Sequence, residues 1–203
     1  MKRWSLTVVF TLVAILALPV VLNAQTDTSQ AKHEVTVQGT GFITKSTSDS
    51  GLTNNPTNSG GFLVGYRYHL NRWFAFEGDF DYFRNTQKYQ SISSFSSVKT
   101  NGYAGTGSLV VKLPSSTFVK PYALVGGGGI VFDPRDTKGI DTQARATFVY
   151  GGGIDIPLIK RVALRTQYRG FVYKVPDFGI SGLAPSKFTH TAVPSVGIVY
   201  TFK

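Results

Sequence analysis

Hydrophobic and polar residues alternate along most of the chain from residue 33 onward, which is the period of β-strands. In the segment 73–84 one face is aromatic and the opposite face is acidic; the aromatic face carries Phe74, Phe76, Phe80 and Tyr82, and the acidic face carries Glu77, Asp79 and Asp81. The same alternation predicts eight strands, at about 33–46, 59–70, 73–84, 99–113, 118–132, 143–156, 162–174 and 187–202. Since no amphipathic helix of useful length is predicted there, the expected fold class is all-β.

The connections between the predicted strands alternate between short and long. Short turns are predicted near Asn71, at 114–117 and at 157–161, and the long polar connections are 47–58, 85–98, 133–142 and 175–186. An even number of antiparallel strands joined in this way is typical of up-and-down barrels in the outer membrane, which have short periplasmic turns and long external loops. All eight strands exceed the roughly 9–11 residues that cross a bilayer obliquely. We therefore predict an eight-stranded antiparallel transmembrane β-barrel over residues 33–203.

The polar faces of the predicted strands hold few charges, and these charges are of both signs. In a membrane barrel such faces point into the lumen, and the predicted lumen charge network is Arg67, Glu77, Asp79, Asp81, Lys112, Arg145, Asp155, Arg165 and Arg169. Arg67 is expected to pair with Glu77 or Asp79, because buried charges need partners. Eight strands leave an interior that side chains can fill, so we predict an occluded lumen.

Aromatic residues on the opposite faces are expected to contact lipid hydrocarbon or the headgroup levels. The residues predicted to face lipid are Trp73, Phe74, Phe76, Phe80, Tyr82, Tyr122, Tyr150, Tyr168, Tyr200 and Phe202. Those near short turns or the C-terminus, which are predicted to form the inner girdle, are Trp73, Tyr122, Tyr200 and Phe202. Within the strand 118–132, both faces of the stretch 122–131 are apolar or glycine, and there we place Tyr122, Leu124 and Ile130 on the outward face.

The first residues of the chain have the pattern of an export signal. A basic start, Met1 to Arg3, precedes an apolar run from Trp4 to Leu22, and Ala24 suits the residue before the cleavage point. Residues 1–24 are predicted to be a signal peptide and 25–32 a flexible leader, with a retained membrane anchor as the alternative because the run is about one helix span long. An exported chain of 203 residues without cysteine suits the envelope of a Gram-negative bacterium.

The formal net charge of +10 does not indicate nucleic-acid binding. Many basic residues outside the predicted lumen fall at strand ends or in loops, where they would meet phosphate headgroups or lipopolysaccharide. We therefore expect outer membrane lipid and lipopolysaccharide as partners, and no nucleic acid.

No cofactor, metal site or enzymatic activity is predicted. The glycine runs 126–129 and 151–153 lack the strand–glycine–helix context of a phosphate-binding loop, and they suit curved barrel strands better. The three histidines lie on separate predicted strands. His190 and Ser195 are five residues apart, which places them on opposite faces of one strand and disfavours a catalytic triad.

Three segments carry a resemblance to a known family: 72–78 (RWFAFEG) after a tight turn, 120–123 (KPYA) leading into glycines, and the closing 196–202 (VGIVYTF). Together with the export signal, they resemble the small outer membrane β-barrels around the OmpA transmembrane domain and OmpX. The resemblance implies insertion by the barrel-assembly machinery and a role in envelope integrity, adhesion or surface interaction. The family usually ends on an aromatic residue, whereas here Lys203 follows Phe202.

The leading hypothesis is a monomeric, non-enzymatic barrel of the outer membrane with an occluded polar lumen. Two alternatives remain open. A soluble periplasmic lipocalin-like barrel would turn its aromatic face inward around an apolar ligand. A narrow ion-conducting pore would pass through Arg67, Glu77 and Arg165.

Overall fold

A computed structural model describes residues 32–45, 47–49, 52–90, 95–114, 118–135, 142–175 and 188–203. The predicted signal peptide, residues 1–24, lies outside the described residues, as do residues 25–31 of the predicted leader. Within the described ranges, no helix has the length and apolar character needed to cross a membrane.

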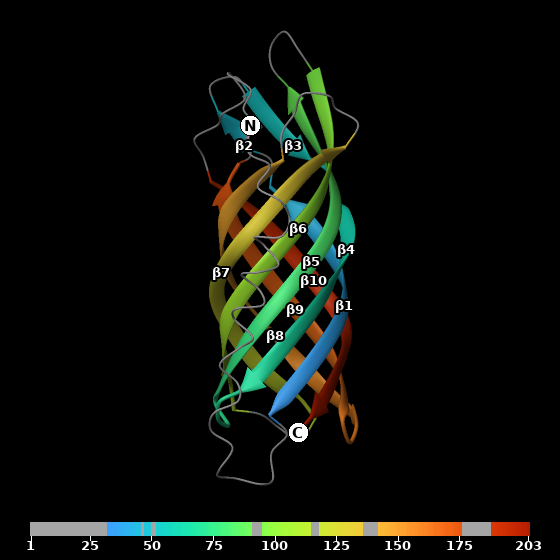
Figure 1. Ribbon diagram of the computed structural model, residues 1–203, viewed down its shortest axis with the longest axis vertical. Helices are drawn as coiled ribbons and strands as arrows, with labels where there is room; N and C mark the ends of the chain where they lie inside the picture. The colour runs from blue at the N-terminus through green and yellow to red at the C-terminus, as the bar shows by residue number, and fades with distance from the viewer. Residues whose placement is uncertain are drawn as a thin grey trace. The chain divides into compact units, whose positions relative to one another are not determined.

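Eight long antiparallel strands form a closed barrel (Figure 1). They are β1 (His33–Thr44), β4 (Ser59–His69), β5 (Phe74–Gln90), β6 (Phe95–Lys112), β7 (Lys120–Arg135), β8 (Gln143–Ile159), β9 (Val162–Lys174) and β10 (Phe188–Phe202). Around the barrel they follow the order β5-β4-β1-β10-β9-β8-β7-β6, and the pairing of β5 with β6 closes the sheet. The strands run obliquely to the barrel axis (Figure 1). The predicted fold class is confirmed.

The strands extend further than predicted at the end of the barrel that carries the long connections. β5 and β6 remain paired as far as Gln90 and Phe95, inside the predicted loop 85–98. Two short strands, β2 (Thr47–Asp49) and β3 (Leu52–Pro56), form inside the predicted loop 47–58, and β3 pairs with β5. These two loop predictions are wrong because a polar composition is compatible with a strand as well as with a loop. Outside the membrane, backbone pairing can continue without an apolar face.

The opposite end carries short turns, and we call it the short-turn end. In the β4–β5 turn, Oδ1 of Asn71 accepts hydrogen bonds from the backbone N–H of Trp73 at 2.8 Å and of Phe74 at 2.9 Å. The backbone N–H of Leu70 donates to the carbonyl of Phe74 at 3.0 Å. Asparagine favours such turns because its side chain replaces a backbone acceptor. Residues 115–117 of the predicted turn 114–117 lie outside the described residues.

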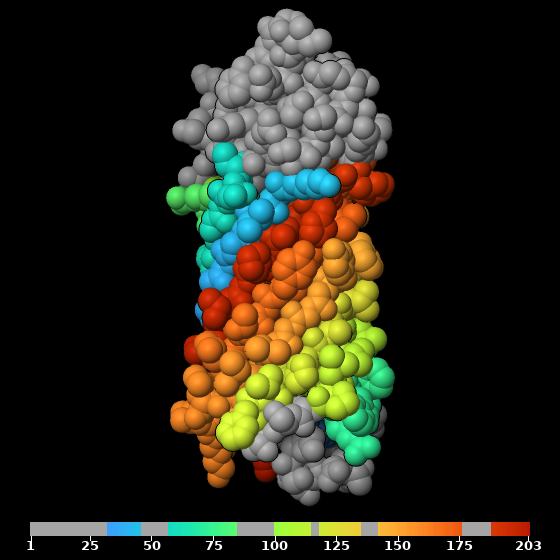
Figure 2. Space-filling view, turned by 180° about the vertical axis from the view of Figure 1, so that it is seen from behind, coloured from blue at the N-terminus to red at the C-terminus, as the bar shows by residue number. Residues whose placement is uncertain are grey.

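The apolar faces of the strands form the outer wall, which Figure 2 shows as diagonal bands lying side by side. On β5, Phe76 is 54% exposed and Phe80 is 43% exposed, whereas Glu77 and Asp79 between them are buried. The aromatic face therefore points outward and the charged face inward, which is the polarity of a barrel surrounded by lipid. A soluble barrel that binds an apolar ligand inside would require the opposite arrangement.

Gly102 provides a test of how tightly the interior is packed. A Cβ atom at Gly102 would lie 2.2 Å from ring carbons of Phe83, whereas a Cβ at Gly107 on the same strand would have nothing within 4 Å. We expect Gly102→Val to lower the free energy of unfolding by about 1–3 kcal/mol through overpacking. Urea unfolding of the barrel refolded in phospholipid vesicles measures this change. Gly107→Val is the matched control, and an equal loss in both variants would contradict the packing argument.

Candidate functional site

The interior near the short-turn end holds a cluster of five charged side chains, which we call the inner charge cluster. Its members are Glu34 on β1, Arg67 on β4, Glu77 on β5, Asp155 on β8 and Arg165 on β9. Strand register creates the cluster, since Arg67 lies opposite both Glu34 and Glu77, and Asp155 lies opposite Arg165. Nε and Nη2 of Arg67 both contact Oε2 of Glu77.

Arg165 connects the members of the inner charge cluster across the lumen. Its Nε and Nη2 donate to the two carboxylate oxygens of Asp155 at 2.7 and 2.8 Å. Nη2 also donates to Glu34 at 2.9 Å, and Nη1 donates to Glu77 at 3.4 Å. One guanidinium group therefore bonds carboxylates from three strands, which buried charges require.

A second ion-pair group spans the barrel from wall to wall. Nη1 of Arg169 on β9 donates to Oδ2 of Asp79 at 3.3 Å, and its Nη2 donates to Oδ1 of Asp81. β9 and β5 lie four positions apart in the closed order of eight strands, so they face each other across the lumen. A single arginine side chain is long enough to bridge this interior, which shows how narrow it is.

Glu34 and His69 are members of the polar interior that the predicted network omitted. His69 Nε2 lies 2.6 Å from Glu34 Oε1. Glu34 lies opposite Arg67 in the pairing of β1 with β4, and His69 lies two residues after Arg67 on β4. Glu34 also shares the inward face of β1 with Gln38. The alternation along 33–46 therefore places Glu34 on the inward face of its strand. Only the register shows that its carboxylate reaches Arg67 and Arg165.

Tyr122 points into the barrel, which corrects the prediction that it forms part of the lipid-facing inner girdle. Its hydroxyl donates to Oε1 of Gln167 at 3.1 Å. The Cζ atoms of Arg67 and Arg165 lie 4.2 and 5.2 Å from its ring centroid, in cation–π geometry. Leu124 and Ile130 also face inward and are buried. On β7 the outward positions are occupied by residues such as Val125, so the larger apolar side chains fill the interior instead.

Aromatic side chains close the interior near the long-connection end, and we call this group the aromatic plug. It consists of Phe42, Phe83, Phe132, Phe171 and Tyr173, all buried. The rings of Phe42 and Phe83 stack with centroids 4.1 Å apart, and Phe132 lies 5.8 Å from Tyr173 and 6.4 Å from Phe83. The aromatic plug was not among the predicted interior residues, although Phe83 shares a face with Asp81 and Phe171 shares one with Arg169.

The remaining predicted residues are placed as follows. Lys112 lies on the inward side of β6 at the short-turn end, and Arg145 lies on the inward side of β8 near the long-connection end. Of the residues predicted to face lipid, those on the outer wall with two-fifths or more of their surface exposed are Phe74, Phe76, Phe80, Tyr150, Tyr168 and Tyr200. Tyr82 and Phe202 are half-buried on the same wall. Trp73 is also exposed, but it follows the β4–β5 turn residue Arg72 and lines a pocket at the short-turn end, which corrects its predicted place in the lipid-facing girdle.

His190 and Ser195 lie on opposite sides of the barrel wall. His190 Nε2 is 3.0 Å from the Tyr150 hydroxyl on the outer side. The Ser195 hydroxyl donates to Oε1 of Gln38 at 2.9 Å in the interior. These two side chains cannot act together on one substrate. In the part of the chain that the structure describes, no group of three or more His, Asp and Glu side chains could hold a metal ion.

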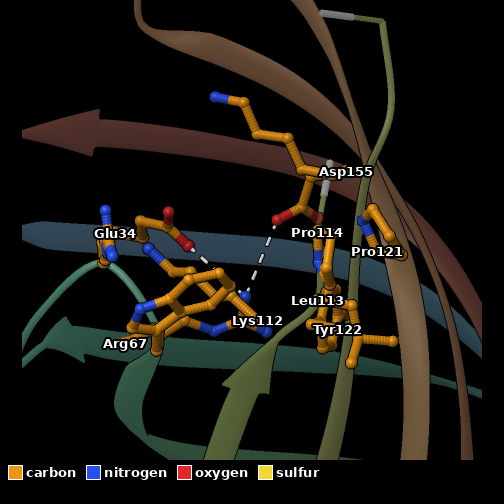
Figure 3. Close-up of a pocket in the computed structure, with 11 residues that line it drawn as sticks. Glu34, Arg67, Lys112, Leu113, Pro114, Pro121, Tyr122 and Asp155 are labelled. Carbon is orange, nitrogen blue, oxygen red and sulfur yellow. Dashed lines mark ion pairs between the residues drawn. The ribbon is translucent and has the colours of Figure 1, made fainter. Parts of the chain in front are cut away.

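A pocket of about 290 Å³ opens below the inner charge cluster at the short-turn end (Figure 3). Arg67 lies at its inner end and contacts Glu34 at 3.7 Å and Asp155 at 3.6 Å. The pocket is lined by Glu34, Arg67, Arg72, Trp73, Lys112, Leu113, Pro114, Lys120, Pro121, Tyr122 and Asp155. It therefore combines charged groups of both signs with apolar walls.

The closed barrel with an apolar exterior and a charged interior defines a class of integral outer membrane proteins. Residues 10–202 match the model of the outer membrane protein beta-barrel domain, and the chain belongs to this family. The protein is therefore located in the outer membrane, which excludes the soluble periplasmic alternative. No curated protein matches the chain significantly.

Two solved structures illustrate the similarity of fold. The outer membrane protein OprG from Pseudomonas aeruginosa superposes with a TM-score of 0.61 at 12% sequence identity, over 85% of this chain and 96% of OprG. Neisserial surface protein A superposes with a TM-score of 0.55 at 15% identity, over 84% of this chain and 97% of that protein. At these identities the similarity concerns the fold alone.

Proposed function

We propose that the protein is a non-enzymatic, monomeric barrel with an occluded lumen, which contributes to the structure of the cell envelope and to interactions at the cell surface. The single observation that carries this proposal is the filling of the interior. Arg67, Arg165 and Arg169 have at most 2% of their surface exposed. A channel that passes ions or solutes freely would leave such groups in contact with water.

The interior is blocked in successive layers along the barrel axis. The inner charge cluster lies nearest the short-turn end. Beyond it, Gln167 accepts a hydrogen bond from Gln38 at 3.3 Å, and Arg169 bridges to β5. The aromatic plug closes the interior near the long-connection end. Because each layer is held by contacts between different strands, a continuous water path would require several of them to break together.

The strand extensions support a role at the cell surface. β5 and β6 continue as a paired ribbon beyond the region that β4 covers, and β3 adds to the edge of β5. In outer membrane barrels the long connections face outward from the cell, so this β-structure would project toward other cells or molecules. Lys45 and Lys174 are exposed at the same end, where they would meet lipopolysaccharide phosphates. Insertion would rely on the barrel-assembly machinery.

Recordings in planar lipid bilayers test the occluded lumen. We expect the wild-type protein in potassium chloride to give no current steps above the protein-free bilayer, because its layers of side chains exclude a hydrated ion. Heat-modifiable migration of protein recovered from the same preparation provides the control for insertion. Current steps whose ion selectivity changes in Glu77→Gln would contradict the proposal and favour the alternative of a narrow pore through Arg67, Glu77 and Arg165.

A further inference from the structure

The pocket at the short-turn end contains positive charge that the barrel itself does not neutralise. The inner charge cluster has three carboxylates, on Glu34, Glu77 and Asp155, and two guanidinium groups, so its net charge is about −1. Three further cations line the pocket together with members of this cluster: Arg72, Lys112 and Lys120. Among the described residues, no ion pair joins any of these three to a carboxylate. The site as a whole therefore carries about two unmatched positive charges.

The three cations converge because of where their strands begin and end. Lys112 is the last residue of β6 and pairs with Tyr122 on β7. Lys120 is the first residue of β7 and pairs with Asp155 on β8. Both lysines therefore occupy positions on the inward face of their strands. Arg72 belongs to the β4–β5 turn, where its Cζ lies 5.0 Å from the Trp73 ring centroid. Cations near lipid headgroups normally point away from the barrel axis. Here Lys112 is half-buried and Lys120 is exposed, and both line the pocket instead of lying only on the outer wall.

The pocket is closed at its inner end. Arg67 and the Tyr122 ring form its floor, and both are held by contacts deeper in the barrel. Its volume of about 290 Å³ lies just below the roughly 300–1,000 Å³ of pockets for drug-sized ligands. A ligand that enters from the short-turn end would therefore be small, and it would have to leave by the same route.

We propose that this pocket binds a small soluble dianion, such as a phosphate or a dicarboxylate, between Arg72, Lys112 and Lys120 on the periplasmic side of the barrel. Two negative charges would match the unneutralised charge of the site. Trp73 and Pro121 would contact the uncharged part of the ligand. Binding would be independent of the display role proposed above, because it uses the opposite end of the barrel.

Trp73 makes the proposal measurable by fluorescence. The sequence contains two tryptophans, Trp4 and Trp73, so a Trp4→Phe background assigns the emission to the pocket. The barrel is refolded in vesicles of zwitterionic phospholipid and titrated with inorganic phosphate and with succinate, and with acetate at matched ionic strength as the monoanion. We expect a saturable change in Trp73 emission with at least one of the two dianions and much weaker binding of acetate.

Substitutions at the two inward lysines identify the site. We expect Lys112→Gln/Lys120→Gln to raise the dissociation constant at least about tenfold, which corresponds to roughly 1.4 kcal/mol. The matched control is Lys45→Gln/Lys174→Gln, which removes two exposed lysines from the other end of the barrel and should leave binding unchanged. Arg72→Gln, in an exposed turn, is a second variant with little risk to folding, and it should also weaken binding.

Three results would overturn the proposal. The first is the absence of any saturable change with either dianion in the wild-type barrel. The second is acetate binding as tightly as the dianions do, which would indicate general screening. The third is equal weakening in the Lys112→Gln/Lys120→Gln variant and in the control variant.

Discussion

Arg165→Ala is expected to lower the free energy of unfolding by about 3–5 kcal/mol, the usual cost of removing one partner from a buried ion pair. Arg165 has 0% of its surface exposed, and its guanidinium group donates hydrogen bonds to Asp155, Glu34 and Glu77. Its removal leaves three carboxylates with Arg67 as their nearest guanidinium group. Urea unfolding of the barrel in phospholipid vesicles, followed by heat-modifiable migration, measures the loss.

Two variants provide the controls for Arg165→Ala. Arg161→Ala removes an exposed arginine from the β8–β9 turn and should change stability by no more than about 0.5 kcal/mol. Arg165→Lys keeps the charge but cannot bond both oxygens of Asp155 as a planar fork does, so we expect a loss between the other two. If Arg165→Ala were as stable as Arg161→Ala, the inner charge cluster would not hold the barrel together.

Phe80→Arg is expected to destabilise the barrel by about 2–4 kcal/mol, because it places a cation in the hydrocarbon on the outer wall. Phe80 is 43% exposed. It lies close to the middle of the stretch of β5, from Ala75 to Phe83, that pairs with β4. The same unfolding measurement applies.

Phe118→Arg is the matched control, since Phe118 is 79% exposed beside the β6–β7 connection. There the arginine would reach headgroups or water, and a change of about 0–1 kcal/mol is expected. Equal effects at the two positions would contradict the placement of β5 across the bilayer. A stabilising effect of Phe80→Arg would do so even more strongly.

Much of the architecture follows from the order of residues along single strands. Alternation separates Phe76 and Phe80 from Glu77 and Asp81, because neighbouring side chains of a strand point to opposite faces. That separation, together with the alternating lengths of the connections, was sufficient to predict the closed barrel and the lipid-facing side of strands such as β5, but not that of β7, where both faces are apolar or glycine. The boundaries of the strands beyond the membrane were not predictable in this way, since polar strands and polar loops have similar compositions.

Contacts between strands that are distant in sequence could not be predicted from the order of residues along single strands. The alternation along each strand predicts that Arg165, Asp155 and Glu77 face the lumen. Closure and register decided that they meet around Glu34, that Arg169 bridges β9 and β5, and that Tyr122 turns inward beneath two guanidinium groups. The reason is geometric: the period of a strand sets the face of each side chain, whereas its height and its partners across the lumen depend on the stagger between neighbouring strands.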